Sequence, residues 1–181
     1  MNSTKKVRAH LNRGGVLAYA TESCYGLGCD PRNYKAVKKI LRLKQRPQSK
    51  GLILVASDFS QLAPYVAPLS SAERALLTRH WPGAVTFLLP AARHAPHWLT
   101  GRHSTLAVRI TAHPDAAKLC HALNMAVVST SANRSGMRPL ATRAACAKSF
   151  GNKVWALPGR IGKRKRPSTI IDIKSGKLIR A

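Results

Sequence analysis

Short apolar segments alternate with amphipathic helical segments along nearly all of this 181-residue chain, and this alternation constrains the fold more than any other feature. Apolar runs bounded by glycine, proline or polar residues predict strands at Val16–Ala20, Gly51–Ala56, Ala84–Leu89, Thr105–Ile110, Met125–Ser129, Lys153–Leu157, Ser168–Ile173 and Lys177–Arg180. Apolar positions at helical spacing predict helices over residues 1–12, 33–46, 70–79, 114–123 and 142–150. Alternating strands and helices are typical of α/β proteins. Hairpin-like spacing near the C-terminal end favours a mixed sheet over a purely parallel one.

Three of the predicted helices begin with recognisable signals. Asn33 can cap the second helix, Ser70 and Glu73 form a capping box before the third, and Pro114 suits the first turn of the fourth. The segment Thr21–Pro31 is instead rich in turn residues, and we expect it to be a loop.

Length and composition fit one domain, residues 1–181, with a substantial core, since 45% of the residues are apolar. No apolar run reaches the roughly 18 residues needed to span a bilayer. The basic N-terminal residues lead into no long apolar stretch of the kind that marks a secretory signal. We therefore expect a soluble, cytoplasmic protein without a membrane partner.

The charge is strongly unbalanced, with 31 Lys and Arg against 6 Asp and Glu and a formal net charge of +25. A compact domain with this charge attracts polyanions, and nucleic acid is the first candidate. A general basic bias without a specific partner stays open as the alternative. The six carboxylates are dispersed along the sequence, so we expect no metal ion held by the protein alone.

Three polar loops follow predicted strands or helices, where α/β proteins often bind ligands. Thr21–Gly28 offers hydroxyls and two glycines that allow close backbone approach. Lys44, Arg46 and Lys50 could clamp a triphosphate, and we expect the first two side chains to face solvent; favourable charges at a helix C-terminus are the alternative. Ser129–Gly136 could donate hydrogen bonds to phosphate or carboxylate oxygens, or could simply be a turn cluster.

Taken together, the motifs resemble the YrdC-like family of threonylcarbamoyl-AMP synthases. The resemblance is carried by Thr-Glu-x-x-Tyr-Gly-Leu-Gly (21–28), Lys-x-Arg-Pro (44–47), Trp-Pro-Gly-Ala-Val-Thr (81–86), Thr-Leu-Ala-Val-Arg (105–109), Ser-x-Ser-Ala-Asn-x-Ser-Gly (129–136) and Pro-Ser-Thr-Ile-Ile-Asp (167–172). It implies a single-domain twisted α/β fold with a basic concave cavity. It also implies synthesis of threonylcarbamoyl-AMP and pyrophosphate from L-threonine, bicarbonate and ATP, with Mg²⁺ carried on ATP. A separate protein complex would then transfer the threonylcarbamoyl group to tRNA.

The resemblance also implies roles for individual residues. Those assigned to the nucleotide are Lys44, Arg46, Ser131 and Asn133, joined by Lys50, Thr105, Ser168 and Arg180; we expect Lys44 and Arg46 to be the catalytic cations. Those assigned to threonine are Ser23, Arg109 and Ser129. Two positions depart from the family pattern: Ala20 replaces a proline, and Val55 replaces a histidine that contacts threonine. The extra C-terminal domain of longer members is also missing.

A cationic run, Lys163-Arg164-Lys165-Arg166, lies in a predicted loop outside the family motifs, and we expect it to bind RNA. This charge also favours a rival function, a non-catalytic RNA-binding module in tRNA or ribosome maturation. Against that reading, aromatic residues make up only 6% of the chain and form no evident row for base stacking. A carbamoyl-handling domain of a larger hydrogenase-maturation enzyme is a second rival, which the absence of flanking domains disfavours.

Overall fold

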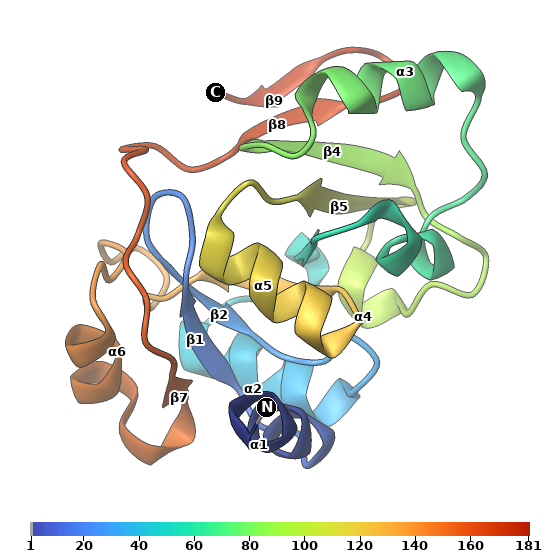
Figure 1. Cartoon of the computed structure of the whole chain (residues 1–181). Helices are drawn as coiled ribbons and strands as arrows, with labels where there is room; N and C mark the ends of the chain where they lie inside the picture. Colours follow the sequence, from blue (N-terminus) through green and yellow to red (C-terminus); the bar gives the residue numbers. More distant parts are fainter. Residues whose placement is uncertain (1) are drawn as a thin grey trace.

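The computed structural model describes residues 2–181 and shows one nine-stranded sheet with helices on both faces (Figure 1). The strands lie in the order β7-β1-β2-β6-β3-β5-β4-β8-β9. Their bounds are β1 Leu17–Ala20, β2 Tyr25–Gly28, β3 Ile53–Ala56, β4 Val85–Pro90, β5 Thr105–Ile110, β6 Val127–Ser131, β7 Trp155–Ala156, β8 Thr169–Asp172 and β9 Leu178–Arg180. The helices are α1 Asn2–Asn12, α2 Tyr34–Lys44, α3 Ser71–His80, α4 His97–Thr100, α5 Pro114–Leu123 and α6 Arg143–Phe150.

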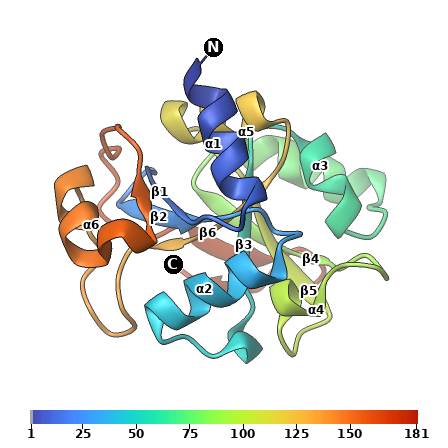
Figure 2. The ribbon, with the colours of Figure 1, turned by 90° about the horizontal axis from the view of Figure 1, so that it is seen from below.

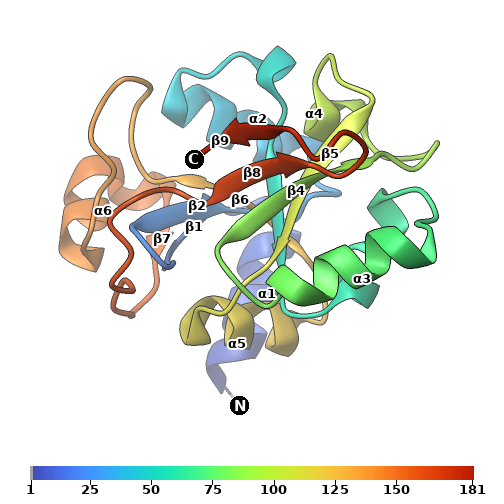
Figure 3. The same ribbon diagram turned by 90° about the horizontal axis from the view of Figure 1, so that it is seen from above.

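The sheet is mixed, as predicted. Strand pairs β1–β7, β3–β5 and β4–β8 are parallel, and the other neighbours are antiparallel. The hairpin β8–β9 completes the sheet beside β4 and carries the C-terminus, as seen from above in Figure 3. The hairpin-like spacing near the C-terminal end therefore predicted this part of the fold correctly.

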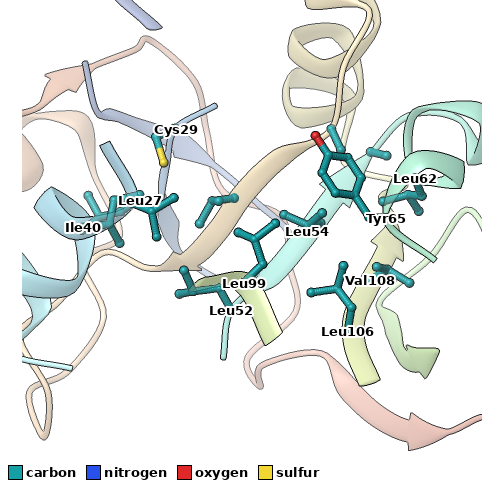
Figure 4. Close-up of a cluster of buried hydrophobic side chains, with 14 of the residues drawn as sticks. Leu27, Cys29, Ile40, Leu52, Leu54, Leu62, Tyr65, Leu99, Leu106 and Val108 are labelled. Carbon is teal, nitrogen blue, oxygen red and sulfur yellow. The ribbon is translucent and has the colours of Figure 1, made fainter. Parts of the chain in front are cut away.

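Two hydrophobic clusters hold the helices against opposite faces of the sheet. Helices α1 and α5 share one cluster, and α2, α4 and α6 contribute to the other (Figure 2). Successive side chains of a strand point to opposite faces of the sheet. Accordingly, Val55 of β3 packs in the first cluster, with α1 and α5, and Leu54 packs in the second cluster, with α2, α4 and α6. Figure 4 shows Leu27 of β2, Ile40 of α2 and Leu54 of β3 in this second cluster.

The helix signals are confirmed. The Asn33 side chain accepts the backbone N–H of Ala36, the Ser70–Glu73 capping box is complete, and Pro114 occupies the first turn of α5. These caps satisfy N–H groups that the first helical turn leaves without partners. Within residues 2–181, no helix is both long and apolar enough to cross a bilayer.

The expectation of a loop across residues 21–31 is wrong, because Tyr25–Gly28 forms the buried strand β2. Its glycines have low strand propensity, so the local pattern does not reveal it. The packing explains Gly28, because a Cβ at this position would come within 2.7 Å of both the Tyr19 ring and the Val128 carbonyl oxygen. Glycine is needed here so that β2 can lie close to its two neighbours in the sheet, β1 and β6.

Candidate functional site

A polar cavity of about 260 Å³ lies where the end of α2, the loop after β6 and the hairpin β8–β9 meet the sheet. It brings together most of the predicted site residues: Ser23, Lys44, Arg46, Arg109, Ser129, Ser131, Asn133, Ser168 and Arg180. Four of these are Lys or Arg, and the described lining includes no Asp or Glu. Residues more than 150 positions apart in sequence therefore converge on one concave surface with the chemistry to receive a polyanion.

Lys44 is buried, with 4% of its surface exposed, so the expectation that it faces solvent is wrong. Its ammonium donates to the backbone oxygens of Ser131 (2.5 Å) and Asn133 (3.0 Å) and to the Asn133 Oδ1 (3.0 Å). The Lys44 carbonyl in turn accepts the Ser135 N–H at 2.8 Å. Lys44 consequently ties the end of α2 to the loop that follows β6.

Burial lowers the pKa of Lys44 to about 8, and the neighbouring Arg46 guanidinium adds to the effect by repulsion. Desolvation penalises the charged form of a lysine, and a nearby like charge acts in the same direction. Near neutral pH the ammonium is thus still charged, but it lies close to its point of deprotonation.

Arg46 is positioned by a sharp reversal at the end of α2. Gln45 adopts a left-handed conformation (φ 52°), which ends the helix and turns Arg46 toward the cavity. One guanidinium nitrogen donates to the Gly51 carbonyl at 3.1 Å, whereas the buried Nε has no partner among the described residues. Burial lowers the pKa of Arg46 as well. Arg46 lines the cavity, where its guanidinium can donate hydrogen bonds to a bound anion.

Arg109 is held by Glu22, a residue that the sequence analysis did not assign to the site. The Glu22 carboxylate lies 3.1 Å from an Arg109 nitrogen and accepts the Thr111 hydroxyl at 2.6 Å. Both ends of the ion pair are nearly buried, with 9% and 14% of the side chains exposed. The signal available in the sequence was that Glu22 is the sole acidic residue within the three polar loops.

Arg180 reaches back from the last strand to the loop before β8. Its guanidinium donates to the Ser168 carbonyl at 2.8 Å and to the Ser168 hydroxyl at 3.1 Å. The Ser168 hydroxyl also accepts from Thr86 of β4 at 2.9 Å. Burial lowers the pKa of Arg180, with further repulsion from Arg109 and Arg46. Three guanidinium groups are thus held close enough to repel one another, a cost that a bound anion would relieve.

Comparison with known proteins identifies the family of this chain. Residues 9–181 match the sequence model of the Sua5/YciO/YrdC family, described as "Telomere recombination". The chain belongs to this family. It is 56% identical to the threonylcarbamoyl-AMP synthase of Chromobacterium violaceum, covering 97% of this chain and 91% of that protein. It is 53% identical to the threonylcarbamoyl-AMP synthase of Thiobacillus denitrificans, covering 97% and 93%.

Solved structures of Sua5/YciO/YrdC proteins share the fold. The P. abyssi Sua5 complexed with L-threonine aligns over 98% of this chain with a TM-score of 0.89 and 30% identity. This chain spans 53% of that Sua5, so about half of the longer protein has no counterpart here. The E. coli YciO structure aligns over 99% of this chain and 88% of its own, with a TM-score of 0.84 and 25% identity.

Lys50 and Thr105, predicted to contact the nucleotide, lie beside the main cavity and not in it. They line an adjoining cavity of about 250 Å³ that shares Arg46 and Arg180 with the first. Val55, at the position of the family histidine, is fully buried among the side chains between the sheet and α1–α5. It therefore adds nothing to the surface of the main cavity, and Ile53 lines that surface from the same strand.

The exposed run of residues 163–166 crosses the edge of the site without lining the cavity. The Arg164 N–H donates to the Glu22 carbonyl at 3.1 Å, and its guanidinium donates to the carbonyls of Arg166 and Pro167. Its role in RNA binding stays a prediction. Among residues 2–181, no three His, Cys, Asp or Glu side chains are placed to share a metal ion.

The lowered pKa of Lys44 predicts pH-dependent anion binding. As pH rises through about 8, the ammonium loses its proton and its attraction for phosphate. The Kd for ATP, whose phosphates stay ionised throughout, should rise about tenfold between about pH 7 and about pH 9. Isothermal titration calorimetry checks this, with Lys44→Met as the control, whose Kd should not change with pH in this range whatever its absolute value. A pH-independent Kd in the unsubstituted protein would contradict the assignment.

Proposed function

We propose that this protein is an L-threonylcarbamoyladenylate synthase, which forms threonylcarbamoyl-AMP and pyrophosphate from L-threonine, bicarbonate and ATP. The observation that carries the proposal is the convergence of Lys44, Arg46, Arg109 and Arg180 on one cavity. Relatives at 56% and 53% identity over nearly their whole length bear the name threonylcarbamoyl-AMP synthase, which supports the same activity here.

The triphosphate of ATP is assigned to the part of the cavity between the end of α2 and β9. Arg46 and Arg180 offer guanidinium forks for phosphate oxygens, and Lys44 adds a buried charge behind the loop of Ser131 and Asn133. The adjoining cavity at Lys50 and Thr105 would take the rest of the nucleotide. It shares two cations with the first cavity, so one ligand could span both.

L-Threonine is assigned to the other end of the cavity, at Ser23, Arg109 and Ser129. Arg109 can pair with the amino-acid carboxylate, while Glu22 fixes the guanidinium from the side away from the ligand. The P. abyssi Sua5 complexed with L-threonine, which shares 30% identity and the fold, supports a threonine site in this chain. Because Val55 is buried, any contact that the family histidine provides must be made by another group.

The proposed reaction needs no protein nucleophile. The threonine amine forms a bond to the carbon of bicarbonate and water leaves, which gives a carbamate. A carbamate oxygen then forms a bond to the α-phosphorus as the bond to pyrophosphate breaks, so the enzyme acts as a nucleotidyltransferase. The cavity contributes by positioning the reactants and by stabilising the charge that builds on the phosphates. Mg²⁺ would arrive on ATP, because the described lining of the cavity includes no carboxylate and Glu22 is engaged by Arg109 and Thr111.

The product is an activated carbamate that requires an acceptor. We propose that a cytoplasmic protein complex transfers the threonylcarbamoyl group to tRNA, in keeping with the +25 charge of this chain. The run Lys163–Arg166 is proposed to contribute to tRNA contact.

Substrate dependence tests the proposed function. ATP turnover should require both L-threonine and bicarbonate and should yield pyrophosphate but no ADP, because the attacking oxygen exists only in the carbamate. Serine should react about 10–200-fold less efficiently, since one methyl group in a fitted pocket is worth about 1–3 kcal/mol. Pyrophosphate release measured with each substrate omitted in turn checks this. Threonine-independent hydrolysis to ADP, or tight tRNA binding without turnover, would leave the RNA-binding module as the better explanation.

Arg46→Ala should lower kcat/KM for adenylate formation by roughly a hundredfold, about 3 kcal/mol of transition-state stabilisation. Arg46 suits this test better than Lys44, because replacing Lys44 would also release the loop of residues 131–135. Arg79→Ala, an exposed residue of α3 outside both cavities, is the matched control and should keep full activity. A folded Arg46→Ala protein with unchanged kcat/KM would remove Arg46 from the site.

A further inference from the structure

Three aromatic rings from distant parts of the sequence meet on the surface beside the start of α2. Tyr34 lies against Trp98 with ring centroids 5.0 Å apart, and His97 meets Trp98 edge-on at 5.3 Å. Tyr34 is 39% exposed and His97 is also exposed. The Trp98 indole N–H donates to the Pro31 carbonyl at 3.0 Å, which fixes the central ring. The fold thus brings Tyr34 next to His97 and Trp98, and we call these three rings the aromatic platform.

A row of cations continues from this platform along the exposed face of α2. Tyr34, Lys38 and Arg42 follow at intervals of four residues, and Lys35 and Lys39 lie alongside them on the same side of the helix. The Lys38 ammonium sits 5.1 Å from the centre of the Tyr34 ring, an arrangement that a base could replace by stacking. Aromatic rings and positive charges are the two elements that bind single-stranded nucleic acid without sequence preference.

No described carboxylate offsets the charge of this face. The acidic residue closest in sequence to α2, Asp30, is 7% exposed and is occupied by the Arg32 side chain at 2.8 Å. The other described ion pairs lie elsewhere, at Arg109–Glu22 and Lys174–Glu73. The α2 face can therefore take up phosphates without first breaking an ion pair.

The row ends at a groove of about 670 Å³ between α1, α2 and α6 that leads toward the candidate active site. Arg42, Arg134 and Lys153 line this groove. The neighbours of Arg134, Asn133 and Ser135, line the nucleotide cavity, so one loop separates the two spaces. Figure 2 shows the arrangement of α1, α2 and α6, the three helices that contribute residues to this groove.

We infer that the exposed face of α2, together with the aromatic platform of Tyr34, His97 and Trp98, binds single-stranded RNA. Bases stack on the platform, and the phosphates follow Lys35, Lys38 and Arg42 toward the groove at Arg134. The inference extends the proposed tRNA partnership to a defined surface, but RNA binding is measured without ATP or threonine. Failure of this surface is therefore distinguishable from failure of the proposed synthase activity.

The stacking element is tested by Tyr34→Ala and Tyr34→Phe. Fluorescence anisotropy with a labelled single-stranded oligouridylate should show about a five- to hundredfold loss of affinity for Tyr34→Ala. Tyr34→Phe keeps the ring and should bind like the unsubstituted protein. His97→Ala gives a second, independent readout, because an exposed histidine can be removed with little effect on the core. Unchanged affinity in both alanine variants would overturn the platform.

The charge element is tested by pairing Lys35→Gln and Lys38→Gln in one protein. The slope of log affinity against log salt should fall by about 1.4, since each contact to a single strand contributes about 0.7. The matched control, Lys5→Gln with Lys118→Gln, removes the same charge from α1 and α5 on the opposite face of the sheet. Its salt slope should be unchanged. An equal loss in both double variants would show a general electrostatic effect and overturn the assignment.

Two further comparisons define the ligand and the surface. An RNA duplex of the same length, which hides its base faces, should bind more weakly than the single strand and should be insensitive to Tyr34→Ala. Neutralising residues 163–166 should leave the Tyr34 effect intact if the two regions act separately. If the duplex binds as well as the single strand and Tyr34→Ala weakens both, the platform serves another role, such as docking a protein partner, and the inference fails.

Discussion

The buried ammonium of Lys44 holds together two of the chain segments that form the main cavity, the end of α2 and the loop after β6. Its side chain donates to the loop after β6, and its own carbonyl accepts from the same loop. Burying a charge is costly unless oxygen atoms surround it, and Ser131 and Asn133 supply those atoms. The geometry of the cavity and the lowered pKa of Lys44 are therefore two consequences of one arrangement. The positions of Arg46, Ser131 and Asn133 all depend on it.

The remaining cavity is a collection of cations held in place by neutral groups and one carboxylate. Arg46 bonds to a backbone carbonyl, Arg180 to Ser168, and Arg109 to Glu22. Burial lowers the pKa of Arg180, and repulsion from Arg109 and Arg46 adds to the effect. The triphosphate of ATP, the proposed ligand, would offset this repulsion. The same excess of positive charge extends over α2, where it is accompanied by aromatic rings and no described ion pair.

Local sequence patterns predicted most of the strands and helices of the fold. Apolar periodicity predicted eight strands and five helices close to their observed bounds. The caps at Asn33 and Ser70 and the first-turn position of Pro114 were confirmed. Strand β2 was not predicted, because the need for glycine at position 28 arises from close contact with Tyr19 and Val128, which the local sequence does not show. The burial of Lys44, the partnership of Glu22 with Arg109 and the clustering of Tyr34 with Trp98 also depend on long-range packing. The motifs of the polar loops predicted which residues would meet, but not which of them would bond to one another.

The central claim is that a carbamate oxygen, positioned by the cavity, attacks the α-phosphorus of ATP. Bicarbonate labelled with ¹⁸O tests this directly, in reactions quenched before the label exchanges with water. The threonylcarbamoyl-AMP should carry two labelled oxygens, one in its carbonyl group and one in the bridge to phosphorus. Ammonia attack at the carbonyl should then release AMP with a single label in its phosphate, as measured by mass spectrometry. Unlabelled AMP phosphate would mean that the bridging oxygen came from ATP, and would contradict the account.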